Sequence, residues 1–206
     1  MSEFMKVVRE RRSANKFIDN IEIPKKVFED IFHELTAAPS AFNLQHAKYY
    51  VVQDEETNAK ITKAAYNQYK AKVSSATIIV TGDKNAYQNA LNIYEGSHML
   101  GILDEKELND MVAMIKDLYE GWGEDFRHDE AVRNASLSAM LFMLLAKEYG
   151  WDTCPMIYFD QEQIREILSL PENEVPTLMI TMGKMDPTSN KIRGARKATA
   201  EFVKFI

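Results

Sequence analysis

The sequence predicts an α+β or mixed α/β domain, and three observations lead to this prediction. Segments with apolar residues at helical spacing alternate along the chain with short runs of β-branched and aromatic residues. No repeat, linker or Ser/Gly-rich stretch interrupts the 206 residues, so we expect one domain over residues 1–206. Hydrophobic residues make up 46% and charged residues 27% of the chain, which excludes a disordered or low-complexity protein.

The first half of the chain is expected to form three helices and two strands. The first helix ends near Arg11, the second begins at Pro24, and the third spans Glu55–Tyr66. Proline suits the first turn of the second helix. The strands are Lys48–Gln53 and Ala76–Thr81. The second strand is continuously apolar, which is typical of a central strand that is covered on both faces.

The second half is expected to hold three helices, one strand and an apolar tail. A capping box at Asp104–Glu107 opens the first helix, and Asp160–Leu168 forms a later one. The strand is Thr177–Met182, followed by a polar, basic loop that runs to Lys197. The tail, Ala198–Ile206, contains Phe and Ile side chains, so it has to dock either on its own sheet or on that of a partner.

The longest predicted helix, Asp129–Tyr149, is apolar almost all the way round between Leu137 and Ala146. A helix that is apolar on all sides is expected to be buried on all sides. This pattern indicates either the centre of the core or a subunit interface, and the residues alone favour neither.

Composition excludes several classes of protein. A net charge of -6 argues against a protein that coats duplex nucleic acid, because such a protein needs a basic face. No signal peptide or membrane-spanning run is found, so a cytoplasmic protein is expected. A single cysteine, Cys154, excludes an intrachain disulfide. The four histidines have no metal-ligand spacing, no nucleophile or phosphate-loop motif occurs, and no metal site is expected.

Three polar clusters remain as candidates for chemistry, and each also has an ordinary structural interpretation. Arg11–Asn15 offers two guanidinium groups, a hydroxyl and an amide for a phosphate or a heterocycle, but it is also typical of a solvated turn. Pro39–His46 offers a hydroxyl and two amides, or simply turn residues. Lys191–Lys197 places four cations in seven residues, forming either an anion site or a solvated segment.

Taken in order, these clusters resemble the flavin-dependent nitroreductase family. The resemblance rests on Arg11-Arg12-Ser13 with Phe17, on Pro39-Ser40-x-x-Asn43-x-Gln45 before a strand, on Gly150-Trp151-Asp152-Thr153-Cys154-Pro155-Met156 before Phe159-Asp160, and on Arg193-Gly194-Ala195-Arg196-Lys197. Each motif is weak alone, but the set spans nearly the whole chain in the order that the family has. The resemblance implies an α+β fold with a mostly antiparallel central sheet flanked by helices. It also implies a domain-swapped homodimer in which the C-terminal strand joins the partner's sheet.

The resemblance further implies one FMN per active site at the subunit interface, with NAD(P)H as the electron donor. By position, the FMN contacts would come from these residues: Arg11, Arg12, Ser13 and Asn15 at the phosphate and pyrimidine edge; Pro39, Ser40, Asn43 and Gln45 from the other protomer; Asn67 or Gln68; Pro155, Met156 and Ile157 at the isoalloxazine ring; and Arg193 and Arg196 at the phosphate. Phe42 and Tyr158 would line the substrate pocket.

The implied activity is hydride transfer from NAD(P)H through flavin N5 to a nitroaromatic, quinone or related acceptor in two half-reactions. The cofactor carries the chemistry, so no catalytic side chain is expected. The chain departs from the motif at Asn15, where many members have a cation, and at His46-Ala47, where the motif has Pro-Trp. Tyr158 stands where glycine is usual and would narrow the pocket. The alternatives are a specialised flavin reductase or dehalogenase-like enzyme, or a flavin-binding redox sensor.

Overall fold

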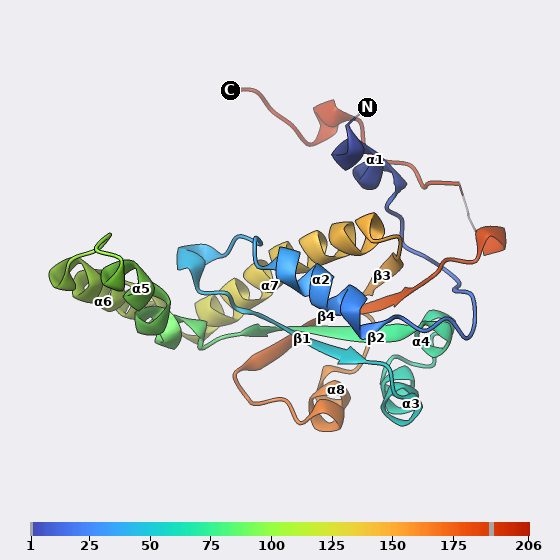
Figure 1. Ribbon diagram of the computed structural model, residues 1–206, viewed down its shortest axis with the longest axis horizontal. Coiled ribbons are helices and arrows are strands. Elements are labelled where there is room, and N and C mark those ends of the chain that lie inside the picture. Colours follow the sequence, from blue (N-terminus) through green and yellow to red (C-terminus); the bar gives the residue numbers. More distant parts are fainter. Residues whose placement is uncertain (1, 190–191) are drawn as a thin grey trace.

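A four-stranded antiparallel sheet forms the centre of the protein, as the predicted α+β class requires (Figure 1). The computed structural model describes residues 2–189 and 192–206. The strands lie in the order β1-β2-β4-β3. Their bounds are Ala47–Val52 for β1, Ala76–Asp83 for β2, Asp152–Met156 for β3 and Glu174–Gly183 for β4.

Helices cover both faces of this sheet, and two of them project beyond it (Figure 1). Helices α2 and α7 lie on one face, α3 and α8 lie on the other, and α5 and α6 form an arm at one end. The bounds are Glu3–Glu10 for α1, Lys25–Leu35 for α2, Glu55–Ala64 for α3, Tyr69–Val73 for α4, Ala90–Met99 for α5, Glu105–Gly121 for α6, Gly123–Glu148 for α7 and Gln161–Leu168 for α8. None of these helices is long and apolar enough to cross a membrane, among the residues that the structure describes.

The prediction of a central, doubly covered strand is confirmed for β2. Ile78 packs among α2 and α7, whereas the next residue, Ile79, packs among α3, α4 and α8. Successive side chains of a strand point to opposite faces, so a strand that is buried on both faces has an uninterrupted apolar sequence. Both isoleucines are fully buried.

Helix α7 lies unusually close to the sheet because small residues meet at the contact. A Cβ atom added to Gly82 of β2 would stand 2.3 Å from the carbonyl oxygen of Ala131. Within a single chain this helix is not buried on all sides, since Leu137 is 49% exposed and Met140 is 43% exposed, and burial of that face in a subunit interface stays a prediction. Its opposite face, which includes the fully buried Phe142, lies in the core.

Three elements were not predicted from the sequence: strand β3, the five-residue helix α4 and helix α5. Strand β3 contains Pro155, which disfavours a strand assignment. Because β3 is at the edge of the sheet, a residue without an N–H group is tolerated there. Helix α5 has a weak apolar face and is positioned by packing against Ile115 and Tyr119 of α6. Helix α7 also begins at Gly123, which has a positive φ of 80° after α6, rather than at Asp129.

The C-terminal tail does not join the sheet of its own chain. Residues 198–206 contain one short 3₁₀ turn, Thr199–Glu201, and no strand. Phe202 is 67% exposed and Phe205 is 96% exposed. The tail extends away from the sheet (Figure 1). Docking on the sheet of a partner stays a prediction.

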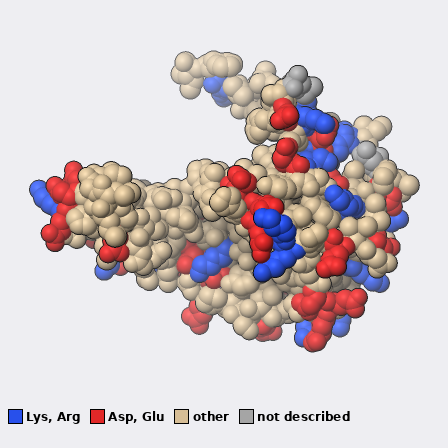
Figure 2. Space-filling view, viewed as in Figure 1, with Lys and Arg blue, Asp and Glu red and all other residues tan. Residues whose placement is uncertain are grey.

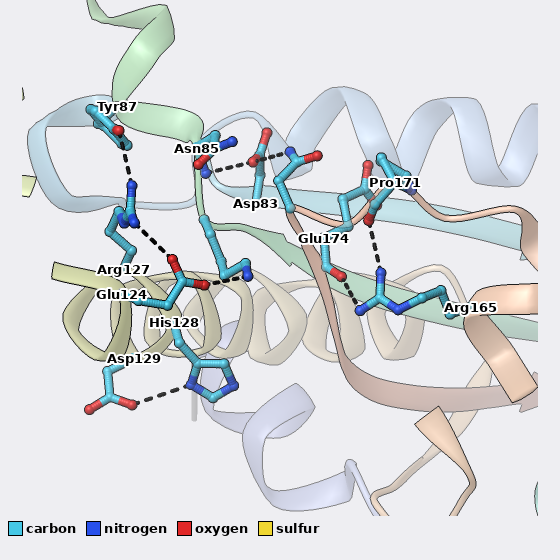
Figure 3. A network of polar contacts seen from close by, with 12 residues as sticks. Asp83, Asn85, Tyr87, Glu124, Arg127, His128, Asp129, Arg165, Pro171 and Glu174 are labelled. Atoms are coloured by element: carbon cyan, nitrogen blue, oxygen red, sulfur yellow. Dashed lines mark hydrogen bonds and ion pairs between the residues drawn. The ribbon is translucent and has the colours of Figure 1, made fainter. Parts of the chain in front are cut away.

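A buried carboxylate joins β1, β2 and the start of β4. Glu174 is 2% exposed and accepts hydrogen bonds from Thr81 at 2.6 Å, Tyr50 at 2.8 Å and Lys48 at 3.1 Å. Arg165 of α8 donates to the backbone carbonyl of the same residue (Figure 3). A buried charge is tolerated where it is paired and fully hydrogen-bonded, as it is here. This network holds the strand ends together at the edge of the sheet near the α5–α6 arm.

Candidate functional site

A basic pocket of about 260 Å³ collects side chains from the two ends of the chain. Its lining includes all the residues of the first and last basic motifs that the sequence analysis assigned to the cofactor: Arg11, Arg12, Ser13, Asn15, Arg193 and Arg196. These segments are about 180 residues apart in the sequence, and the fold brings them together. Lys191, of the same C-terminal cluster, lies outside the described residues.

The N-terminal segment reaches this pocket because it pairs with the edge strand β3. The Ala14 N–H donates to the carbonyl of Thr153 at 3.0 Å, in a parallel bridge to that strand. Ala14 and Phe17 are fully or almost fully buried. In an extended segment the intervening residues point the other way, so Ser13 and Asn15 are exposed at the pocket.

Arg193 closes the pocket by binding the backbone of the opposite segment. Its Nη2 atom donates to the carbonyl oxygens of Arg9 at 2.6 Å and Arg11 at 3.1 Å. Arg196 binds its own loop, through Nη1 and the carbonyls of Gly194 and Ala195. Both guanidinium groups are therefore held by neutral carbonyl oxygens.

The positive charges in this pocket lie close enough together to shift the pKa of one of its arginines. Partial burial lowers the pKa of Arg11, and repulsion from Arg193 and Arg196 lowers it further. Figure 2 shows basic side chains gathered at the base of α1. An anion bound among these guanidinium groups would remove the repulsion, so the pocket is suited to a phosphate.

The end of β3 and the residues that follow it differ in how far their side chains are exposed. Met156 is 5% exposed and packs in the core, so only its backbone can face a ligand. Pro155 is half-buried, and Ile157 is 78% exposed. The Tyr158 ring packs against Tyr66, with 4.4 Å between the ring centroids. This contact holds the Tyr158 ring beside the α3–α4 turn.

Sequence reasoning missed Lys70, which lies next to this segment. Asn67, which the resemblance indicated, is exposed in the turn between α3 and α4 with a φ of 55°. Lys70 follows on α4, and its Nζ atom donates to the Sγ atom of Cys154 at 3.3 Å. No motif in the sequence singled out Lys70, because its position beside Cys154 depends on how α4 packs against β3.

The Pro39–Gln45 loop holds an uncommon backbone conformation. Phe42, Asn43 and Gln45 have φ values of 49°, 53° and 53°. Residues other than glycine rarely adopt positive φ; the conformation costs about 1–3 kcal/mol per residue and persists only where the surrounding structure holds it. Tyr94 of α5 donates to the carbonyl of Phe42 at 2.9 Å, and Ser40 Oγ accepts from the N–H of Gln45 at 3.0 Å.

Buried polar groups of α6 and α7 hold both ends of the loop. At the first end, the Ala41 N–H donates to Asn134 Oδ1 at 2.7 Å, and the Asn134 amide donates in turn to the backbone and carboxylate of Glu130. At the other end, Nε2 of His46 lies 3.3 Å from the hydroxyl of Tyr119, which donates to Glu130 at 3.4 Å. Burial lowers the pKa of His46 to about 4, so the ring is neutral at pH 7. One side chain, Glu130, thus links both anchors.

Within one chain the strained loop and the basic pocket are separate. The loop follows the C-terminal end of α2, whereas the basic pocket is lined by residues that follow α1 and by the C-terminal segment. The cavity next to the loop shares no lining residue with the basic pocket. Phe42 and Tyr158, assigned to one substrate pocket, have different neighbours: the Phe42 carbonyl binds Tyr94 of α5, whereas the Tyr158 ring packs on Tyr66. If these residues act on one ligand, the second set has to come from another copy of the chain.

Comparisons with known proteins agree with this architecture. Residues 8–184 match the model of the nitroreductase family. The chain is 50% identical to MhqN of Bacillus subtilis (strain 168), which is named as an NAD(P)H nitroreductase, over 100% of both chains. The crystal structure of a protein described as the nitroreductase YdfN of Bacillus subtilis has a TM-score of 0.97 and 48% identity, covering 99% of each chain. One from Exiguobacterium sibiricum 255-15, described as a nitroreductase in complex with FMN, has a TM-score of 0.90 and 28% identity, covering 100% of this chain and 98% of that chain.

Proposed function

The chain belongs to the nitroreductase family, and on that premise we propose that it is an FMN-dependent oxidoreductase that uses NAD(P)H to reduce small organic acceptors. The observation that carries the proposal is the basic pocket, where Arg11, Arg193 and Arg196 come together. Bound FMN supplies the redox chemistry, since its ring can accept a hydride from NAD(P)H and pass two electrons on. The work of the protein is then binding, orientation and electrostatics.

The residues of the pocket fit the phosphate end of FMN. Arg11 and Arg193 offer guanidinium groups whose planar donors match phosphate oxygens. The exposed Ser13 hydroxyl adds a neutral donor. We assign the pyrimidine edge of the flavin to Asn15, which donates hydrogen bonds there without adding a positive charge. Lys70 supplies a cation on the β3 side that the motif comparison had not indicated.

A homodimer completes the proposed site. The exposed side chains Leu137 and Met140 on α7 offer an apolar face for a second copy. The Pro39–Gln45 loop, held rigidly by α6 and α7, would then bring Ser40 and Asn43 to the flavin of the partner. We also propose that the exposed apolar tail joins the partner's sheet, because β1 has a free edge. Burying Phe202 and Phe205 in this way removes large apolar side chains from water.

Nitroaromatics and quinones are the proposed acceptors, reduced in two half-reactions through one site. Tyr158 bears on the alternative of a redox sensor, in which this ring blocks the nicotinamide. The Tyr158 ring packs on Tyr66 at the rim of the proposed site, and the residue is 66% exposed. This arrangement favours the enzyme over the sensor.

The first test is an absorption spectrum of the purified protein, followed by anaerobic addition of NADH or NADPH. We expect a flavin band that bleaches with at least one nucleotide and returns when a quinone is added. Initial rates at several quinone concentrations should give the parallel double-reciprocal lines of a two-step exchange. Failure to bind added FMN would refute the proposal, and a bound flavin that no nucleotide reduces would favour the sensor.

A pair of variants tests the basic pocket itself. Arg193→Ala removes a guanidinium group from the pocket, whereas Lys197→Ala removes the same charge from an exposed position outside the pocket lining. Because a charge-assisted hydrogen bond contributes about 1.5–3 kcal/mol, we expect Arg193→Ala to weaken FMN binding about 10- to 100-fold. Quenching of FMN fluorescence by the apoprotein measures the Kd. Equal effects of the two substitutions would contradict the assignment.

A further inference from the structure

One buried side chain, Glu130 of α7, connects the two anchors of the Pro39–Gln45 loop. It is 6% exposed, and in the described part of the chain it lines neither the basic pocket nor the cavity beside the loop. Its two carboxylate oxygens have different partners. Oε1 pairs with Arg133, whereas Oε2 accepts hydrogen bonds from Asn134 at 3.1 Å and from Tyr119 at 3.4 Å. Both partners of Oε2 in turn contact the loop or its end.

The carboxylate fixes which way the side-chain amide of Asn134 faces. Carboxylate oxygens only accept hydrogen bonds, so the Nδ2 group of Asn134, which carries both protons, points to Glu130. It donates to Oε2 of Glu130 and also to the backbone carbonyl of the same residue at 2.7 Å. The amide oxygen is thereby left facing the loop, where it accepts from the Ala41 N–H at 2.7 Å. An amide turned the other way would set one donor against another.

The same carboxylate orients the hydroxyl of Tyr119. This hydroxyl has one proton, and an ionised carboxylate is a stronger acceptor than a neutral imidazole nitrogen. The phenolic oxygen therefore accepts from Nε2 of His46 at 3.3 Å, next to the end of the loop. The Tyr119 ring is fully buried and stacks on Tyr87, so packing holds this hydroxyl in place.

These anchors matter because the loop between them is strained. Phe42, Asn43 and Gln45 have positive φ, a conformation that persists only where the surrounding structure holds it. Ser40 and Asn43 of this loop are the side chains that the proposed function brings to the flavin of the partner. Without the anchor at Ala41 the backbone of the loop can relax, and these two side chains then leave their positions.

We propose that Glu130 is a positioning residue for the FMN that is bound by the partner subunit. It acts through Asn134 and Tyr119, whose orientations keep the loop in place. This inference rests on the proposed function, and in particular on the homodimer. Because the loop serves the partner's flavin, loss of Glu130 from one chain should weaken the site whose basic pocket belongs to the other chain.

Three substitutions separate the acceptor role of Glu130 from its packing. Glu130→Leu removes both oxygens but keeps a side chain of similar size, and should weaken FMN binding about tenfold. Glu130→Gln keeps one acceptor oxygen, and the exposed Arg133 can turn away from the new amide, so the Kd should stay within about twofold of that of the unmodified protein. Asp129→Leu, the same change at an exposed neighbour, should have little effect. Equal Kd values for Glu130→Leu and Glu130→Gln would overturn the proposal.

A second readout needs no flavin. Hydrogen–deuterium exchange of the apoprotein, followed by NMR, reports directly on the Ala41 N–H, which the bond to Asn134 protects. This N–H should exchange about tenfold faster in Glu130→Leu and at the unmodified rate in Asp129→Leu. Unchanged exchange in Glu130→Leu would overturn the proposal. If Glu130→Leu does not fold, Tyr119→Phe, which removes only a hydroxyl, should still weaken FMN binding, and an unchanged Kd would count against the inference.

Mixed dimers test on which flavin Glu130 acts. In a dimer of one Glu130→Leu chain and one Arg193→Ala chain, one site combines an intact basic pocket with an intact loop, and the other site has neither. Random assembly of co-expressed chains should therefore restore tight FMN binding to about a quarter of all sites. No recovery would overturn the proposal. Unmodified protein that binds no FMN, or that sediments as a monomer, would instead refute the proposed function on which this inference rests.

Discussion

The buried imidazole of His46 predicts a pH dependence of stability that can be worked out from the structure. Burial lowers its pKa from 6.5 to about 4 in the folded protein. Between these values the unfolded chain takes up a proton that the folded protein does not. Stability rises with pH wherever the unfolded state binds more protons than the folded state. The free energy of unfolding therefore decreases as the pH falls through this window. The contribution of His46 to the free energy of unfolding is fully present above pH 6.5 and has been lost once the pH is below about 4.

The size of this effect follows from the displacement of the pKa. A tenfold change in proton affinity corresponds to 1.36 kcal/mol, so the full contribution of His46 is about 3 kcal/mol. At pH 5 the unfolded histidine is almost fully protonated and the folded one is mostly neutral. The expected loss between pH 7.5 and pH 5 is therefore about 2 kcal/mol.

Urea unfolding at the two pH values, followed by circular dichroism, measures the loss. Other groups titrate in the same range, so the difference from a variant isolates the contribution of His46. His46→Asn should be less stable at pH 7.5 but should lose about 2 kcal/mol less on acidification. The matched control, His33→Asn, changes an exposed histidine of α2 and should behave like the unmodified protein. An equal pH dependence in all three proteins would refute the reasoning.

Three further predictions concern packing, the buried carboxylate and assembly. Gly82→Ala should destabilise the protein by about 3 kcal/mol in urea unfolding, because the new Cβ would stand 2.3 Å from a carbonyl oxygen of α7. Gly96→Ala, in an open helical position, should instead be neutral or stabilising. Glu174→Gln should cost about 2–3 kcal/mol in the same assay, because it replaces a buried, paired charge, whereas the exposed Glu172→Gln should change stability little. If α7 forms the subunit interface, Leu137→Lys should shift sedimentation from dimer to monomer, and an unchanged sedimentation coefficient would count against that interface.

The sequence by itself determined those features that depend on short-range pattern. The short, unbroken run Ala76–Thr81 was sufficient to predict a central strand, because it is rich in β-branched residues and a strand that is buried on both faces has a continuously apolar sequence. The capping box at Asp104 marked the start of α6, since its two hydrogen bonds need only residues three apart. The ordered motifs likewise predicted the family, because they are local runs that can be compared one by one.

Only the tertiary structure decided which of these local features meet. Arg193 binds the backbone of Arg9 and Arg11, a contact between segments whose sequences contain no sign of each other. His46 looked like an ordinary loop residue, yet packing on α6 and α7 buries it and determines its charge. The fold places Lys70 of α4 beside Cys154 of β3, a contact that neither residue's local sequence indicates. Contacts of this kind depend on how whole helices pack on the sheet, and packing is a property of many distant residues acting together.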